Sequence, residues 1–144
     1  MQQRENEGVV KRIRGALAGR QEVLEAYLFG SRARGDARPG SDIDIAVYLD
    51  PSLVEDLTGH AAQLAADLIA TLHDNRVDLV MLNSAPPLLY HRVLRDGIRV
   101  LSRDLGATTT REGRALSRYC DYLPFLRKID SAHAARIARG EFGQ

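Results

Sequence analysis

The chain has 144 residues, of which 44% are hydrophobic and 27% are charged. A chain of this length folds as one domain around a single core, and no apolar run approaches the roughly 18 residues of a membrane span. The 20 basic and 19 acidic side chains give a net charge of +1, which does not favour a nucleic-acid coat protein. A single cysteine, Cys120, excludes an internal disulfide and argues against a structural zinc site.

The two ends of the chain differ in character. The first residues, MQQRENEG, lack the basic start and apolar centre of a signal peptide, so we expect a cytoplasmic protein. Residues 103–144 carry a net charge of +3, whereas residues 1–102 carry −2. A mildly basic tail is typical of a solvated helix face, and it also suits docking to an acidic partner.

Hydrophobic periodicity predicts alternating helices and strands in the first half of the chain. Apolar residues at helical spacing predict a helix over residues 8–19. The run VLEAYLF predicts a strand over 23–29 that leads into a turn at Gly30-Ser31. A loop rich in Gly, Arg and Pro follows, and a second strand is expected over 42–49.

The second half of the chain continues the alternation. We expect a long helix over 52–73, a third strand over 76–82 and a fourth over 98–101. A short helix between the last two should open at Pro86-Pro87 and end at Gly97. From Thr110 the chain is expected to be helical to about residue 138, with Thr109 or Thr110 as N-cap and a kink or interruption at Pro124.

Two carboxylates stand one residue apart where the second strand begins. Side chains on a strand alternate between faces, so Asp42 and Asp44 should point the same way with Cα atoms about 6.5 to 7 Å apart. Carboxylates this close repel unless cations lie between them. Mg²⁺ prefers carboxylate and phosphate oxygens, and two ions about 3.5 to 4 Å apart can clamp a phosphoryl transfer. The pair therefore predicts a two-magnesium site.

Asp78 is the predicted third carboxylate of this site. It is the only charged residue between Val77 and Asn83, on a strand that could pair beside the second one. An Asp inside an apolar strand costs several kcal/mol unless it is solvated, paired or bound to metal. We therefore expect Asp78 to supply the third carboxylate of the metal site.

The turn at Gly30-Ser31 is the predicted phosphate site, ten residues before the carboxylate pair. Gly30 allows backbone N–H groups to approach a phosphate, and Ser31 adds a hydroxyl donor at the start of a helical turn. Arg32 and Arg34 stand beside it and should neutralise leaving pyrophosphate. No GK[ST] follows the glycine and GxGxxG is absent, which argues against a P-loop or a Rossmann site.

Each feature alone also has a structural explanation. Gly-Ser turns are common, a DxD pair can be a solvated strand end, a buried Asp can bond to backbone, and an arginine loop can simply be solvated. Their joint order along strand, turn, strand, helix and strand is much rarer and favours catalysis.

The segment GSRARGDARPGSDIDIAV resembles the active-site signature of the DNA polymerase β-like nucleotidyltransferases, and in so short a chain their minimal nucleotidyltransferase branch. The tail RALSRYCDYLPFLRK resembles the C-terminal helix of minimal nucleotidyltransferases encoded beside HEPN ribonuclease toxins. The residues that match the superfamily pattern position by position are Gly30, Ser31, Asp42, Asp44 and Asp78.

The resemblance implies an α/β (α+β) fold, in which a small mixed β-sheet of about four strands is backed by helices and followed by a C-terminal helix. It implies a single domain over residues 1–144, with a catalytic core of about 22–103 and a helical tail of about 110–138. The implied catalytic and metal ligands are Asp42, Asp44 and Asp78.

The resemblance also implies the chemistry. Two Mg²⁺ ions and ATP would serve transfer of AMP to a tyrosine of a cognate HEPN toxin, which would silence that toxin in a complex without membrane or nucleic acid. Two alternatives stay open: an antitoxin that acts by covering its partner, and an enzyme acting on an aminoglycoside-like small molecule or an RNA end. An intact carboxylate triad argues against a decayed active site.

The tail offers a candidate partner surface. Four apolar residues at core spacing should pack on the domain, which leaves Tyr122 and Phe125 to contact a partner. The four expected core residues are Leu116, Tyr119, Leu123 and Leu126.

Overall fold

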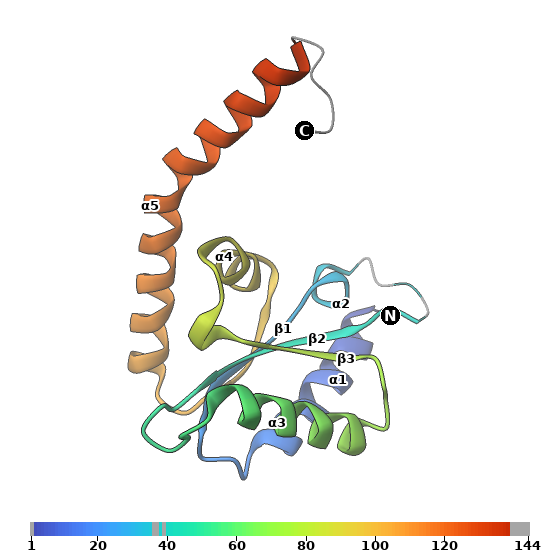
Figure 1. Cartoon of the computed structure of the whole chain (residues 1–144). Coiled ribbons are helices and arrows are strands. Elements are labelled where there is room, and N and C mark those ends of the chain that lie inside the picture. The colour runs from blue at the N-terminus through green and yellow to red at the C-terminus, as the bar shows by residue number, and fades with distance from the viewer. Residues whose placement is uncertain (1, 36–37, 39, 139–144) are drawn as a thin grey trace.

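A four-stranded sheet organises the protein, with the strands in the order β3-β2-β1-β4. The computed structural model describes residues 2–35, 38 and 40–138. Strand β1 (Val23–Phe29) pairs antiparallel with β2 (Ile43–Leu49) and with β4 (Ile98–Ser102). Strand β3 (Val77–Met81) pairs parallel with β2. The predicted mixed sheet of four strands is therefore confirmed (Figure 1).

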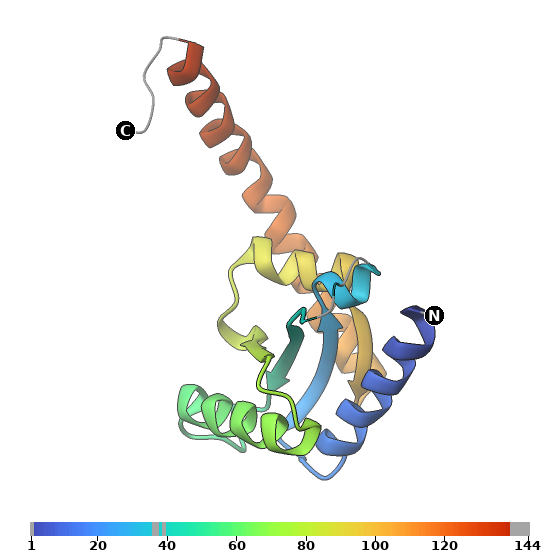
Figure 2. The ribbon, with the colours of Figure 1, turned by 90° about the vertical axis from the view of Figure 1, so that its right-hand side faces the viewer.

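Helices cover both faces of this sheet (Figures 1 and 2). Helices α1 (Gln2–Leu17) and α3 (Leu57–Leu72) pack on one face over the larger apolar core. Helix α4 (Pro87–Asp96) and the first part of α5 (Leu105–Ala138) pack on the other face over a smaller core. A 3-10 turn, η1 (Leu82–Ser84), links β3 to α4.

Alternation along β2 decides which side chains are available for chemistry. Ile43, Ile45 and Val47 are buried in the larger core beneath α1 and α3. The residues between them point to the α4 and α5 face, because successive side chains on a strand face opposite ways. Asp44 and Tyr48 thus share the face that the smaller core covers only in part.

Two predicted helices have different starting points in the structure. Helix α1 begins at Gln2 rather than at residue 8, because its first two turns are polar and give no apolar period. Helix α3 begins at Leu57 rather than at residue 52, because Asp56 is its N-cap and accepts a hydrogen bond from the Gly59 N–H at 3.0 Å.

Helix α5 begins at Leu105, so the expectation of an N-cap at Thr109 or Thr110 is wrong. Asp104 takes that role, since its Oδ1 accepts from the Ala107 N–H at 3.2 Å. The hydroxyls of Thr109 and Thr110 instead donate to carbonyls of the preceding turn, as threonines inside a helix do.

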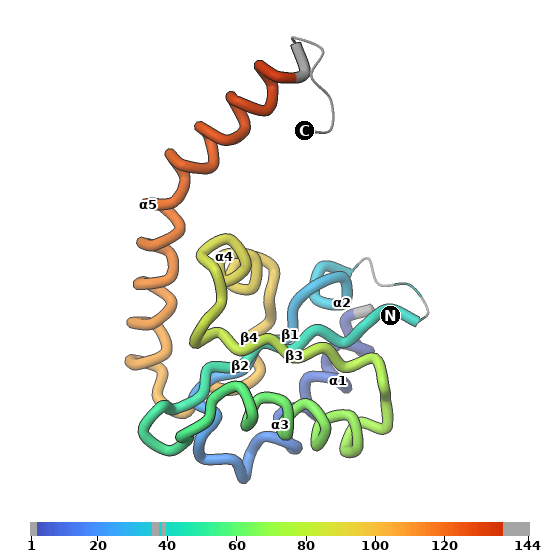
Figure 3. The backbone as a smooth tube through the Cα atoms, in the orientation of Figure 1, coloured from blue at the N-terminus to red at the C-terminus, as the bar shows by residue number. Residues whose placement is uncertain are grey.

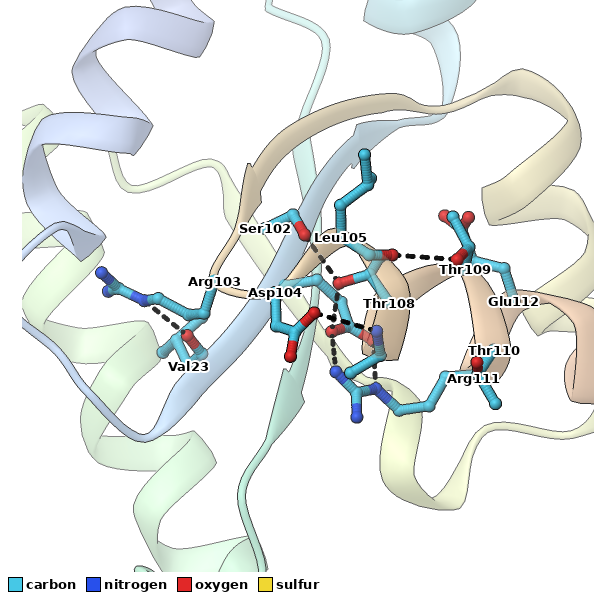
Figure 4. A network of polar contacts seen from close by, with 12 residues as sticks. Val23, Ser102, Arg103, Asp104, Leu105, Thr108, Thr109, Thr110, Arg111 and Glu112 are labelled. Atoms are coloured by element: carbon cyan, nitrogen blue, oxygen red, sulfur yellow. Dashed lines mark hydrogen bonds and ion pairs between the residues drawn. The ribbon is translucent and has the colours of Figure 1, made fainter.

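A buried ion pair fixes the base of α5 to β1. Glu25 is fully buried and accepts two hydrogen bonds from the Arg111 guanidinium, at 2.7 and 2.6 Å. The Thr108 hydroxyl donates to the same carboxylate at 3.1 Å, and Figure 4 shows Thr108 and Arg111 side by side in this network. Removing one partner of such a pair costs about 3 to 5 kcal/mol, because a charge is left buried and unpaired.

The second half of α5 leaves the body of the protein, as Figure 3 shows. The helix stays continuous through Pro124 but bends, because proline lacks the N–H of the helical ladder and crowds the preceding turn. Leu116 is 44% exposed, so the expectation that it packs in the core is wrong, and Ala115 is buried instead. No helix in the described part of the chain is long and apolar enough to cross a membrane.

Candidate active site

Asp44 and Asp78 lie side by side on the sheet. Strands β2 and β3 are parallel, so both begin at the same edge, and Asp44 is in register with Asp78. Neighbouring strands are about 4.8 Å apart, and residues in register on parallel strands share a face. The carboxylate that the sequence assigned to the third strand therefore stands beside the DxD pair.

Asp42 lies just before β2, which begins at Ile43 and not at residue 42 as expected. It is exposed, as is Asp78, whereas Asp44 is half-buried. Burial raises the pKa of Asp44, and the charges of Asp78 and Asp42 raise it further, while Arg34 lowers it. Asp42 and Asp78 thus both lie within electrostatic reach of Asp44.

These carboxylates fit a magnesium ion that arrives with a phosphate. Over residues 2–35, 38 and 40–138, no three His, Cys, Asp or Glu side chains converge closely enough to hold a metal ion unaided. Mg²⁺ is usually bound by one or two carboxylates plus substrate phosphates and waters, so a complete protein cage is not required. A divalent cation would relieve the repulsion that raises the Asp44 pKa.

The turn after β1 and the Asp44 carboxylate are built as one unit. Gly30 has φ +77°, a conformation that disfavours residues with a Cβ. A Cβ placed on Gly30 would overlap Oδ2 of Asp44 and lie 3.0 Å from its Cγ. Helix α2 (Ser31–Arg34) starts directly after this glycine, which confirms the predicted helical turn. The absence of a side chain at residue 30 therefore lets Asp44 lie against the turn.

The two arginines of α2 have different surroundings. The Arg32 guanidinium donates to the carbonyl of Ser41 at 3.2 Å, and the Arg32 carbonyl accepts from the Asn6 side chain at 2.8 Å. Arg34 is exposed, and its charge lowers the pKa of Asp44. The charge of Arg34 therefore reaches Asp44, whereas Arg32 forms a hydrogen bond to the segment just before Asp42. The two arginines are two residues apart in the sequence, and no local pattern predicts that their contacts differ.

The contact between α1 and α2 beside the candidate site was also not predicted from the sequence. A pocket of about 670 Å³ lies between α1, α2 and β4 and includes Arg34 in its wall. Asn6 both lines this pocket and holds α2 through its hydrogen bond. A polar helix start contains no pattern that predicts such a contact.

The raised pKa of Asp44 predicts how stability depends on pH without Mg²⁺. The folded state binds this proton more tightly than the unfolded state, so the Asp44 contribution to stability should fall as pH rises from about 4 through the raised pKa. Thermal unfolding across this pH range should show that fall in stability for wild type and not for Asp44→Asn. Asp121→Asn, an exposed change on α5, should keep the wild-type profile. Parallel profiles for wild type and Asp44→Asn would refute the electrostatic account.

Comparison with known proteins is consistent with this geometry. Residues 11–105 match the family model described as polymerase beta, nucleotidyltransferase. The protein adenylyltransferase MntA of Shewanella oneidensis is 35% identical over 97 residues, which are 67% of this chain and 65% of MntA. The matched part thus spans less than two thirds of that relative.

Solved structures show the same fold over most of the chain. A chain in a crystal structure of a toxin-antitoxin with AMP-PNP has a TM-score of 0.69 at 28% identity, covering 86% of this chain and 98% of its own. A chain in the structure of tri-AMPylated Shewanella oneidensis HEPN toxin with MNT antitoxin has a TM-score of 0.62 at 27% identity, covering 92% and 99%. From its signature residues, its sheet and the match over residues 11–105, this chain belongs to the polymerase beta nucleotidyltransferase family.

Proposed function

We propose that this protein is a Mg²⁺-dependent adenylyltransferase that acts as an antitoxin, moving AMP from ATP to a tyrosine hydroxyl of a cognate HEPN toxin. The observation that carries the catalytic part is the register of Asp44 with Asp78 beside the Gly30 turn. The similarity to MntA and to chains of toxin-antitoxin structures supports the choice of nucleotide and partner. ATP as substrate also supports a cytoplasmic location.

In this proposal the three carboxylates have different roles. Asp42 and Asp44 would hold two Mg²⁺ ions, with Asp78 completing one site. Bound Mg²⁺ supplies neutralisation of the charge that develops on the phosphate oxygens. Asp78 would accept the proton of the attacking hydroxyl as the new O–P bond forms at the α-phosphorus and the bond to pyrophosphate breaks.

The turn would bind the part of ATP that leaves. Backbone N–H groups after Gly30 and the Ser31 hydroxyl would hold the β- and γ-phosphates. Arg34 is exposed beside the carboxylates and would neutralise pyrophosphate, with Arg32 supporting the loop.

The division of the chain follows from the same proposal. We assign residues 1–144 to a single domain, with the catalytic core at about 22–103 and the helical tail as the partner-facing element.

Exposure of Asp42 and Asp78 supports an acceptor that enters from solution, and a docked protein can present its own hydroxyl there.

A label on the α-phosphate tests the reaction. With Mg²⁺ and the HEPN partner, ATP labelled at the α-phosphate should mark the partner, and ATP labelled at the γ-phosphate should not. Labelling of an RNA end or a small molecule, with the partner unmarked, would contradict the proposed acceptor.

Asp78→Asn should separate binding from turnover. Removing one metal ligand and the proposed base affects the transition state more than the ground state, so nucleotide affinity should be largely kept while kcat falls about a hundredfold or more. Calorimetry with AMP-PNP and a transfer assay would measure the two effects. Unchanged kcat would make Asp78 a structural strand residue.

The exposed half of α5 should contribute to partner binding. Phe125 is 55% exposed and its ring lies 5.5 Å from that of Tyr122, on the part of α5 that leaves the body. The double change Tyr122→Ala and Phe125→Ala should weaken the complex at least tenfold with little change in Tm. Leu53→Ala, equally exposed but on the far loop before α3, should leave affinity unchanged. A large fall in Tm would instead assign the pair to the domain core.

A further inference from the structure

A second pocket lies on the same face of the sheet as Asp44 and Asp78. Its volume is about 820 Å³, within the range of small-molecule sites. We call it the α5 pocket; it is lined by Tyr48 of β2, Tyr90 of α4 and the α5 residues Thr110, Arg111, Gly113, Arg114, Ser117 and Arg118. Among the described residues, no acidic side chain lines it.

The α5 pocket carries positive charge that the described residues do not balance. The charge of Arg111 is offset by Glu25, which accepts both of its hydrogen bonds. Arg114 and Arg118 are exposed, and neither forms an ion pair with a described residue. Two cations on one helix face, four residues apart, match the spread of oxygens on a phosphate.

A buried hydroxyl beside these arginines lacks a partner. Tyr90 is 1% exposed, and its hydroxyl has no hydrogen-bond partner among the residues that the structure describes. An unmade hydrogen bond of this kind costs about 1 to 3 kcal/mol. The hydroxyl lies within electrostatic reach of Glu25, Tyr48, Arg111 and Arg118, and all of these except Glu25 line the pocket. A ligand oxygen there would supply the missing acceptor.

The walls of the pocket also suit a flat ring. The Arg111 guanidinium lies 4.9 Å from the ring centroid of the half-buried Tyr48. The Arg118 guanidinium lies over the buried Tyr90 ring, 5.8 Å from its centroid, so Tyr48 and Arg111 supply the stacking surface. Nucleobases stack on aromatic rings and on guanidinium planes. Phosphate-binding cations and stacking surfaces within one cavity are the features that a nucleotide requires.

We propose that the α5 pocket binds a nucleoside monophosphate group, with its phosphate on Arg114 and Arg118 and its base against Tyr48 and the Arg111 guanidinium. Tyr48 is four residues from Asp44 along β2, about 13 Å, so this site is separate from the metal site. The group could be a free nucleotide or an AMP already joined to the partner. The second source rests on the proposed function, and the first does not.

Calorimetry with AMP in EDTA tests the site without catalysis or metal. Wild type should bind AMP, and the double change Arg114→Ala and Arg118→Ala should weaken binding at least tenfold. Arg4→Ala with Arg92→Ala removes the same charge from exposed positions outside the pocket and should leave affinity unchanged. Tyr90→Phe should weaken binding several-fold without lowering Tm, because the hydroxyl has no hydrogen-bond partner to lose among the described residues.

Partner dissociation distinguishes the two sources. If the group is attached, AMPylated partner should dissociate from wild type at least several-fold more slowly than unmodified partner, and the Arg114→Ala, Arg118→Ala protein should lose that difference. Absence of both effects would overturn the proposal, as would AMP binding that the double change leaves intact. Arginine-dependent binding of a single-stranded oligonucleotide without binding of AMP would overturn it in favour of a nucleic-acid site. AMP binding by a protein that never labels its partner would refute the proposed function alone.

Discussion

Asp44→Asn should reduce AMP transfer about a thousandfold or more, on the order of 4 kcal/mol of transition-state stabilisation. The amide keeps the shape of the carboxylate, but it lacks the negative charge that would help to bind Mg²⁺ at the α-phosphate. Asp44 is the central carboxylate, in register with Asp78 and close enough to Asp42 that both raise its pKa.

The same change should not destabilise the metal-free protein at neutral pH. Asp44 is half-buried and repelled by two neighbouring carboxylates, so removing its charge removes an unfavourable interaction. Loss of transfer with an unchanged or higher Tm is expected of a residue selected for function and not for stability. Asp121→Asn is the matched control and should change neither quantity.

Cell rescue by Asp44→Asn separates the catalytic antitoxin from the steric one. If neutralisation requires AMP transfer, cells that express the partner should not survive with this variant. Rescue that persists while labelling of the partner is lost would show that covering the partner is sufficient.

Gly30→Ala should have the second largest effect, through two physical causes. A residue with a Cβ is strained at φ +77°, at a cost of about 1 to 3 kcal/mol. The added methyl would also overlap Oδ2 of Asp44 and displace that carboxylate. A shift of about 1 Å in a catalytic group can cost about a hundredfold in rate, so we expect a lower Tm and a loss of transfer of at least that size.

Gly8→Ala provides the matched control for this change. Gly8 lies in α1, and a Cβ there would have no atom of the described residues within 4 Å. Alanine in a helix is favoured over glycine by about 1 kcal/mol, so this variant should be slightly more stable and fully active. Full activity of Gly30→Ala would show that the Asp44 carboxylate does not need its present position against the turn.

Local signals in the sequence predicted much of the fold. Strand β1 has the predicted bounds, because its apolar run ends at a glycine. Helix α4 begins at Pro87 and ends before Gly97, as the positions of these two residues predicted. The start of α5 was missed although Asp favours the N-cap position, because the threonines that follow Asp104 are further N-cap candidates.

The site was predictable where its residues are close in sequence. Asp42 and Asp44 are close because only one residue separates them, although Asp42 lies just before β2 and not on it. The register of Asp44 with Asp78 depends on parallel pairing of strands that are separated by α3, and no local pattern fixes that register. The α5 pocket was not predicted for the same reason, since β2, α4 and α5 each supply only part of its lining.

The mass of the intact HEPN partner after incubation with this protein and Mg-ATP tests the central claim most directly. The account predicts that the partner gains one or more AMP residues on a hydroxyl, that pyrophosphate is released, and that no nucleic acid is needed. The gain should be absent with EDTA and with Asp44→Asn. A partner of unchanged mass in the presence of active protein and Mg-ATP would contradict the account.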